Sequence, residues 1–310
     1  MDAKLATDTM RWISKSRVFR TLSMMPFASL LHFAMQRYLT KEWPRSADDL
    51  EAYAKRAETF IALFRRYSSL EIDALSFIEI GAGRDLALAL ALRCIGVRHI
   101  ICLDIERLGD LKLINHAAAY MGRRWNIKTT KIRHWTDLES LGIQYIAPAR
   151  LKDLELGPGS VACFFSTEVM EHIEMHSLLE TIHDSHRLLH RDGLSVHAID
   201  FSDHYARSDQ SISRFNFLTL SDAEWKPHNS RYHYVNRLRH SEYLNIFCAA
   251  GFQIISDEVF RQEVPSEILG GLADRFRAMS YADISALRTI LVARKRDEGK
   301  AAEATNVEGG

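Results

Sequence analysis

The stretch Phe77-Ile-Glu-Ile-Gly-Ala-Gly-Arg84 decides the fold of this chain of 310 residues. A short apolar run carries one acid, Glu79, and ends in two glycines separated by one residue, after which an apolar helix pattern begins. A second apolar run, residues 98–104, ends in Asp104. The order strand, glycine turn, helix, strand, acid is typical of a nucleoside-binding βαβ unit. The nucleoside cofactor that this unit holds therefore decides the function.

Strand and helix patterns alternate outward from this unit. The predicted strands are 76–80, 100–104, 143–146, 161–166, 194–199, 252–255 and 289–293. The predicted helices between them are 86–95, 108–121, 177–189, which a turn at Asp192-Gly193 follows, and 240–250. Because helices of this length separate most of the strands, the pattern predicts an α/β fold with a doubly wound, mostly parallel sheet of seven strands.

Two segments lie outside this alternation. Residues 1–70 carry helical patterns and predict an N-terminal helical cap before a domain at 71–300, and residues 301–310 predict a flexible tail. Residues 201–238 form an aromatic-rich insertion after the fifth strand, and this aromatic content argues against disorder. We expect the insertion to be a lid over the sheet or a second small core, with a slight preference for the lid.

Composition narrows the classes of partner and the compartment. Lys+Arg and Asp+Glu both number 40, so no global charge directs the protein to nucleic acid, and none is expected as a partner. The four cysteines form no CxxC pair, which favours free thiols and a cytoplasmic location. No apolar run is long enough to predict a transmembrane segment. Residues 22–38 leave peripheral membrane contact open, although core packing is favoured.

The glycine turn distinguishes between two cofactors. A dinucleotide fingerprint needs a third glycine at the position of Leu86, so the sequence disfavours a nicotinamide cofactor. S-adenosyl-L-methionine has no phosphate; it needs glycines where the backbone passes its methionine part, and an acid suits its positive charges. Glu79 meets that need, and Asp104 at the next strand end can accept hydrogen bonds from both ribose hydroxyls.

At this point the sequence resembles the class I S-adenosylmethionine-dependent methyltransferases. Glu79-Ile-Gly-Ala-Gly83 resembles their first motif, and Asp104 resembles the acid after their second strand. Ser166-Thr-Glu-Val-Met-Glu-His-Ile173 is similar to the segment after their fourth strand, and Arg187-Leu-Leu-His-Arg-Asp-Gly193 to the turn before their fifth. The resemblance covers residues 70–295 and implies a Rossmann-like methyltransferase fold and methyl transfer from S-adenosyl-L-methionine.

The resemblance also implies a set of residues that contact the cofactor. They are Glu79, Gly81, Ala82, Gly83, Arg84, Asp104, Ile105, Ser166 and Glu168. The chain departs from the family at Asp85, where a third glycine is common, and at Ala162, where an acid is common. An acid expected near the adenine amino group is missing around residues 146–150, and Asp153 is the nearest.

Candidate catalytic residues follow the fourth and fifth strands, because site residues gather beyond the carboxyl ends of strands in an open sheet. We expect His204 to act as a general base for a hydroxyl acceptor, with Asp203 or Asp200 orienting it. His172 is expected to border the methyl site, as are Glu168 and Glu171, whose alternative role is to stabilise a helix start.

No metal site is expected. His172 and His176 have the spacing of a helical ligand pair, but Ile173 stands where HExxH has glutamate, and the histidines at 183, 186 and 190 complete no set. The leading hypothesis is methylation of a small molecule, apolar or ring-containing, at oxygen first and at carbon or nitrogen as alternatives. A non-catalytic binding or scaffold protein with the same fold is the second hypothesis, and a nicotinamide-dependent oxidoreductase is the third.

Overall fold

One sheet of seven strands organises the molecule, in the order β3-β2-β1-β4-β5-β7-β6. The strands are β1 Ser76–Ile80, β2 Ile100–Leu103, β3 Ile143–Ile146, β4 Val161–Thr167, β5 Leu189–Asp200, β6 Phe252–Arg261 and β7 Ala286–Lys295. Strands β1 to β5 are parallel, and β7 runs antiparallel to both of its neighbours. This computed structural model describes residues 11–25, 27–39 and 42–296, so the predicted tail at 301–310 lies outside the described residues. The predicted fold class is confirmed.

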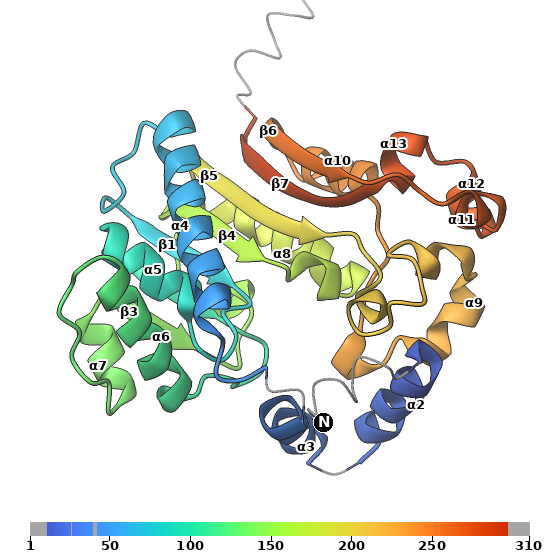
Figure 1. The fold of residues 1–310 in the computed structure, drawn as a ribbon. Coiled ribbons are helices and arrows are strands. Elements are labelled where there is room, and N and C mark those ends of the chain that lie inside the picture. The colour runs from blue at the N-terminus through green and yellow to red at the C-terminus, as the bar shows by residue number, and fades with distance from the viewer. Residues whose placement is uncertain (1–10, 26, 40–41, 297–310) are drawn as a thin grey trace, which may run out of the picture.

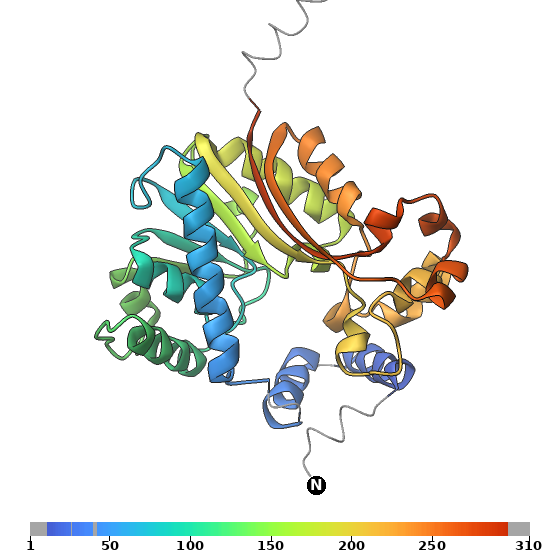
Figure 2. The same ribbon diagram turned by 45° about the horizontal axis from the view of Figure 1, so that its top comes forward.

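Helices cover both faces of the sheet (Figures 1 and 2). One face carries α4 Ala47–Tyr67, α5 Ala87–Ile95, α6 Leu111–Arg124 and α7 Trp135–Ser140, whose apolar side chains share one buried cluster with β1 and β2. The other face carries α8 Met175–Leu188 and α10 His240–Ala249, which pack in a second cluster. The long α4 therefore belongs to the core of the sheet, although it comes from the predicted N-terminal cap.

Local sequence signals explain where these helices begin and end. Ser46 caps α4 in a capping box with Asp49, and Asp110 accepts two backbone N–H groups at the start of α6. Helix α5 is apolar on every side because it lies between the sheet and α4, and it ends at Gly96 with a φ of 116°.

The insertion builds a third hydrophobic cluster beside the sheet. Its short helices are η4 His204–Arg207, η5 Asn216–Thr219, α9 Asp222–Trp225, η6 Lys226–His228 and η7 Arg231–His233. They share buried side chains with the segment that contains α11 Ser266–Gly270, α12 Asp274–Arg277 and α13 Tyr281–Ile284. Helix α2, Trp12–Ser23, packs against η6 and η7 and not against the sheet (Figure 1). The second small core, which was the less favoured of the two expectations for this insertion, is present.

The remaining short elements border the carboxyl end of the sheet. They are α3 Ala28–Ala34, the π-helix η1 Met35–Leu39, η2 Leu151–Asp153 and η3 Met170–His172. Within the described residues, no helix has both the length and the apolar character needed to cross a membrane.

Strand β5 corrects one detail of the sequence analysis. Asp192-Gly193 was predicted as a turn before the strand, but β5 already begins at Leu189. Val161 and Cys163 of β4, two residues apart, pair with Leu189 and Leu194 of β5, which are five residues apart. The extra residues of β5 form a bulge, and Gly193 lies in it. A Cβ at Gly193 would stand 2.7 Å from the carbonyl oxygen of Ala162, which explains why this position has no side chain.

Candidate cofactor and acceptor site

A pocket of about 1210 Å³ opens at the carboxyl end of the sheet. Strand order reverses between β1 and β4, and in open α/β sheets such a switch point is where ligands bind. The glycine turn after β1, the loop after β2 and the segment after β4 form one wall. Residues of the insertion form the other wall, so the insertion lines this pocket as well as forming its own core.

The two glycines of the turn have different surroundings. Both take the left-handed conformation, with φ of 73° at Gly81 and 71° at Gly83. A Cβ at Gly81 would stand 2.6 Å from Cγ1 of Val169, so this position packs against the segment after β4. A Cβ at Gly83 would meet no atom within 4 Å. The backbone at Gly83 is therefore open to the pocket, as a ligand passing close to it would require.

Asp104 follows β2 and is held by two backbone groups. Its Oδ2 accepts the N–H of Gly83 over 3.1 Å, and its Oδ1 accepts the N–H of Glu106 over 3.3 Å. Burial raises the pKa of Asp104, and these N–H groups oppose that shift because they stabilise the carboxylate. Each oxygen keeps a lone pair for a ligand, so the side chain can accept two hydroxyl groups at once.

Other cofactor candidates line the same wall. Ile105 is 71% exposed, an unusual exposure for isoleucine, and offers an apolar surface next to Asp104. Arg84 lines the pocket and lies over the ring of Phe33 at 4.0 Å, which links the glycine turn to α3. Glu168 lines the pocket with a φ of 53°.

Three of the predicted contact residues lie behind the pocket wall. Glu79 is 4% exposed and accepts a weak hydrogen bond from Sγ of Cys102, and burial raises its pKa well above the usual value. Ala82 is 8% exposed. Ser166 is fully buried, with its hydroxyl 2.8 Å from Nδ1 of His197. These side chains support the turn and the sheet and do not line the pocket, and their contact with the cofactor stays a prediction.

Sequence reasoning missed Arg45, which lines the pocket next to Trp43. Its guanidinium lies over the rings of Trp43 at 4.6 Å and Tyr53 at 4.4 Å, and its Nε donates to Oδ2 of Asp85 over 2.9 Å. Asp85, a departure from the family pattern, is thus neutralised by an arginine that precedes α4. No local motif marks Arg45, because α4 brings it to the turn only in the folded chain.

Asp153, the acid nearest to the expected adenine position, does not line the pocket. Asp153 accepts the N–H of Arg150 over 2.8 Å, inside its own turn. The lining residues near it are Ala149, Arg150, Leu151 and Lys152. This part of the wall therefore offers aliphatic surface and two basic side chains, Arg150 and Lys152, which both pair with Glu180.

The insertion wall supplies aromatic and basic side chains. They are Trp225, Tyr232, Tyr234, Arg231 and Arg237. Arg231 of η7 donates a hydrogen bond to Glu106, which follows β2, and this ion pair connects the two walls across the pocket.

Of the four predicted catalytic residues, only His172 lines the pocket. Its Nδ1 lies 2.6 Å from the carbonyl oxygen of Tyr234, which can only accept, so Nδ1 carries the proton and Nε2 has a free lone pair. Desolvation by the surrounding walls and the neighbouring His204 lower the pKa of His172 to about 4, so the ring is neutral at pH 7.

His204 lies one layer deeper than predicted. It is 6% exposed, and its ring centroid is 4.9 Å from that of His172. Asp200 lies near it, with Oδ2 at 3.6 Å from Nε2 of His204, but the same Oδ2 also accepts a hydrogen bond from Arg207 over 2.5 Å. Burial favours protonation of Asp200, yet His204 and Arg207 hold its pKa below the usual value.

Asp203 does not orient His204. Its carboxylate caps η4 by accepting the N–H of Tyr205 over 2.9 Å, and it also accepts Nδ2 of Asn216 over 3.3 Å. Burial raises the pKa of Asp203 to about 6. Of the two acids expected to orient His204, Asp200 is therefore the one that lies beside it, because the chain turns into the insertion directly after β5.

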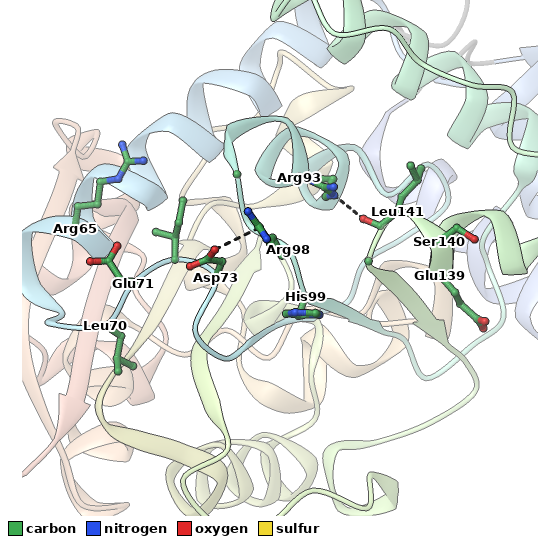
Figure 3. A pocket seen from close by; sticks show the side chains of 13 residues that line it. Arg65, Leu70, Glu71, Asp73, Arg93, Arg98, His99, Glu139, Ser140 and Leu141 are labelled. Carbon is green, nitrogen blue, oxygen red and sulfur yellow. Dashed lines mark hydrogen bonds and ion pairs between the residues drawn. The ribbon is translucent and has the colours of Figure 1, made fainter.

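A second pocket, of about 810 Å³, lies at the amino end of the sheet (Figure 3). The loops before β1, β2 and β3 line it, and two of its arginines are already paired: Nε of Arg98 lies 3.3 Å from Asp73, and Arg93 donates to the carbonyl oxygen of Leu141. Because ligands of open α/β sheets bind at the opposite end, the pocket beside Asp104 is the better candidate site.

Comparisons with known proteins give weak likenesses only. No family model matches the sequence, and no curated protein matches it. An S-adenosylmethionine-dependent methyltransferase from Mesorhizobium loti is 16% identical, with 76% of this chain and 96% of that chain covered and a TM-score of 0.43. Geranyl diphosphate C-methyltransferase from Streptomyces coelicolor is 13% identical, with 78% of this chain and 79% of that chain covered and a TM-score of 0.42. A [4+2]-cyclase is 14% identical, with 76% of this chain and 80% of that chain covered and a TM-score of 0.44. Likenesses of this size do not assign an activity, and the fold rests on the strand order of this chain itself.

Proposed function

We propose that the protein binds S-adenosyl-L-methionine in the pocket at the carboxyl end of the sheet and transfers its methyl group to a small molecule. One observation carries this proposal. The carboxylate of Asp104 is fixed by Gly83 beside a glycine turn that leaves open space, and this pairing of groups suits a ribose next to an amino-acid tail.

Each part of the cofactor has a candidate partner in the pocket wall. Asp104 would accept the two ribose hydroxyls, and Ile105 would pack against the adenine ring. The methionine part of the cofactor would lie against the backbone at Gly83, and Arg45 would bind the carboxylate of this methionine part. Leu86 fills, with a fully buried side chain, the position where a dinucleotide fingerprint has its third glycine, which counts against a nicotinamide cofactor.

When bound, the cofactor supplies a methyl group that its sulfonium already activates. The chain therefore needs to align the acceptor with that methyl and to exclude water from it. The insertion wall does both, because Arg231 connects it to the loop after β2 and its aromatic side chains line the space opposite Asp104.

The acceptor is proposed to be apolar or ring-containing. Trp43, Trp225, Tyr232 and Tyr234 offer ring faces and edges in the pocket, which suit a flat acceptor. Methylation of a hydroxyl oxygen is the first expectation, and carbon or nitrogen atoms are alternatives. The cytoplasmic location also remains a proposal, which rests on the scattered cysteines of the sequence.

The test has two stages. Calorimetry with S-adenosylhomocysteine should give micromolar-range binding, and fluorescence titration with NADH should give none. Incubation with cofactor labelled in the methyl group and a panel of phenols, catechols and small heterocycles should then give a labelled product by mass spectrometry. Absence of cofactor binding would overturn the proposal. Binding without turnover would favour the alternative of a non-catalytic binding protein, which the burial of His204 away from the pocket motivates.

A further inference from the structure

Three side chains converge on one point beside the pocket, and one of them, His172, lines its wall. The ligand atoms of Glu171, His172 and His204 all lie within 4.8 Å of one another. Glu171 and His172 come from η3 after β4, and His204 comes from η4 after β5, so neighbouring strands bring them together. Two imidazoles and a carboxylate on one side of a site are a common ligand set for divalent transition metals.

Glu171 has no other explanation among the described residues. It is 1% exposed, and neither oxygen of its carboxylate has a hydrogen-bond partner there. A buried carboxyl group without a partner costs folding free energy, so such groups are rare unless they bind something. Glu171 stands in the first turn of η3, but its side chain caps no helix among these residues.

His172 presents a free lone pair in the same place. Nδ1 of His172 donates to the carbonyl oxygen of Tyr234, which fixes the tautomer and leaves Nε2 as the acceptor. Such an outer hydrogen bond to a carbonyl is typical of metal-binding histidines, since it orients the ring and makes the other nitrogen a better ligand.

Around the cluster, Asp200 and Glu168 have ion-pair partners and Glu171 has none among the described residues. Arg207 lies 2.5 Å from Asp200 and 3.4 Å from Glu168, and it also contacts His204 at 3.3 Å. Arg56 adds a second cation beside Glu168 at 3.6 Å. No cation pairs with Glu171 within the described residues. Arg207 attracts Glu171 only from beyond ion-pair distance, so the carboxyl group without a direct partner is one of the three that converge in the cluster.

We propose that Glu171, His172 and His204 bind one divalent first-row transition-metal ion, of the Zn²⁺ or Fe²⁺ type, at the wall of the pocket. Ligands around a tetrahedral zinc lie about 3.4 Å apart, so the widest pair has to close by about 1–2 Å, which side-chain rotation allows. Nitrogen ligands disfavour Mg²⁺ and Ca²⁺, which prefer sites made of oxygen. His172 and His204 then act as ligands and not as proton acceptors.

The site has a consequence for the acceptor, and this part rests on the proposed function. Three protein ligands leave at least one coordination position open, and His172 lies where the cluster meets the pocket. An acceptor with a hydroxyl or enol oxygen can fill that position, which lowers the pKa of that hydroxyl group and holds its oxygen still. The proposal therefore favours oxygen acceptors over purely hydrocarbon ones.

The experiment uses the full chain without a polyhistidine tag, freed of metal by a chelator. Calorimetric titration with Zn²⁺, and visible absorption during titration with Co²⁺, should both show one ion per chain. Glu171→Gln and His172→Gln should each weaken binding of both ions by about 100-fold or more. His176→Gln is the matched control: it removes a histidine of the next turn, 86% exposed and paired with Glu180, and should leave binding unchanged. Mg²⁺ should bind far more weakly than Zn²⁺.

Two further readouts separate the possible failures. Zn²⁺ should raise the melting temperature of the wild type by several degrees and leave that of Glu171→Gln unchanged. Circular dichroism should show that both variants fold, and S-adenosylhomocysteine binding to the metal-free protein reports on the proposed function alone. The proposal is overturned if the wild type binds no Zn²⁺ at millimolar concentration, if Mg²⁺ binds more tightly, or if Glu171→Gln and His172→Gln bind like the wild type.

Discussion

The backbone N–H of Gly83 donates a hydrogen bond to Oδ2 of Asp104 over 3.1 Å. This contact joins the turn after β1 to the end of β2, which are adjacent in the sheet. Together with the N–H of Glu106 on the other oxygen, it fixes the carboxylate of Asp104 where this residue lines the pocket. The relationship makes the two strongest sequence features, the glycine pair and the acid, parts of one site.

The two glycines of the turn should respond differently to alanine. Gly81→Ala adds a Cβ at 2.6 Å from Val169 to the strain of a φ of 73°, so we expect a loss of about 3 kcal/mol of unfolding free energy. Gly83→Ala should lose only about 1–2 kcal/mol of unfolding free energy, through the backbone strain of its positive φ, because its Cβ contacts no other atom. That Cβ would, however, occupy the space proposed for the cofactor. Urea denaturation and S-adenosylhomocysteine calorimetry measure the two effects.

Gly159 provides the control for this comparison. It has a φ of 73°, a Cβ there would meet no atom within 4 Å, and it lies in the loop before β4, at the other end of the sheet. Gly159→Ala should therefore lose the same stability as Gly83→Ala and keep wild-type affinity. Equal affinities for Gly83→Ala and Gly159→Ala would contradict the assignment of the turn.

His197 should make the stability depend on pH. Its Nδ1 and Nε2 lie 2.8 Å and 2.7 Å from the hydroxyls of Ser166 and Ser195, and burial lowers its pKa to about 3. In the unfolded chain His197 has an ordinary pKa of about 6.5, so as the pH falls it takes up a proton there before it does in the folded protein. The contribution of the neutral imidazole to the unfolding free energy is therefore complete above pH 6.5 and is lost as the pH falls toward 3. The expected slope is about 1.4 kcal/mol per pH unit.

His197→Gln removes this titration and keeps a polar side chain between the serines. Urea denaturation at several pH values from 4.5 to 7.5 gives the difference in unfolding free energy between wild type and variant, in which other titrating groups largely cancel. That difference should shrink by about 2–3 kcal/mol between pH 6.5 and 4.5. A difference that stays constant over this range would refute the buried neutral imidazole.

The ion pair of Arg231 with Glu106 should control exchange of the cofactor more than stability. Arg231 is 67% exposed, so Arg231→Gln should cost less than about 1 kcal/mol of unfolding free energy. Because the pair connects the two walls of the pocket, its loss should speed release of S-adenosylhomocysteine several-fold, as stopped-flow fluorescence can measure.

The matched variant is Arg98→Gln. Its side chain is 68% exposed and pairs with Asp73 at the amino end of the sheet, away from the pocket (Figure 3). Its release rate should equal that of the wild type. If both arginine variants release the cofactor at the wild-type rate, the insertion does not retain it through this pair.

The parts of the fold and site that depend on local signals could be predicted from the sequence. The turn at Gly81 and Gly83, the strand that ends at Asp104 and the apolar helix between them need only neighbouring residues to be recognised. The bulge at Gly193 could not be told from a turn, because its glycine is required by a contact with Ala162 of another strand.

The site was harder to predict wherever tertiary packing decides side-chain direction. Ser166 is the last residue of the expected strand, and its hydroxyl contacts His197, its partner in the register with β5, instead of lining the pocket. Asp203 follows the next strand, but the burial of Tyr205 in the third cluster turns the chain and makes Asp203 a cap. Arg45 carries no motif at all. Spacing along one strand contains none of this information.

The most direct test of the central claim is calorimetric titration of wild type, Asp104→Asn and Asp153→Asn with S-adenosylhomocysteine. Asp153→Asn removes the same charge close to the pocket from a side chain that is turned into its own loop, so its affinity should equal that of the wild type. Asp104→Asn loses one charge-assisted hydrogen bond to ribose, about 1.5–3 kcal/mol, and should bind about 10- to 100-fold more weakly. Equal affinity of Asp104→Asn and wild type would contradict the account.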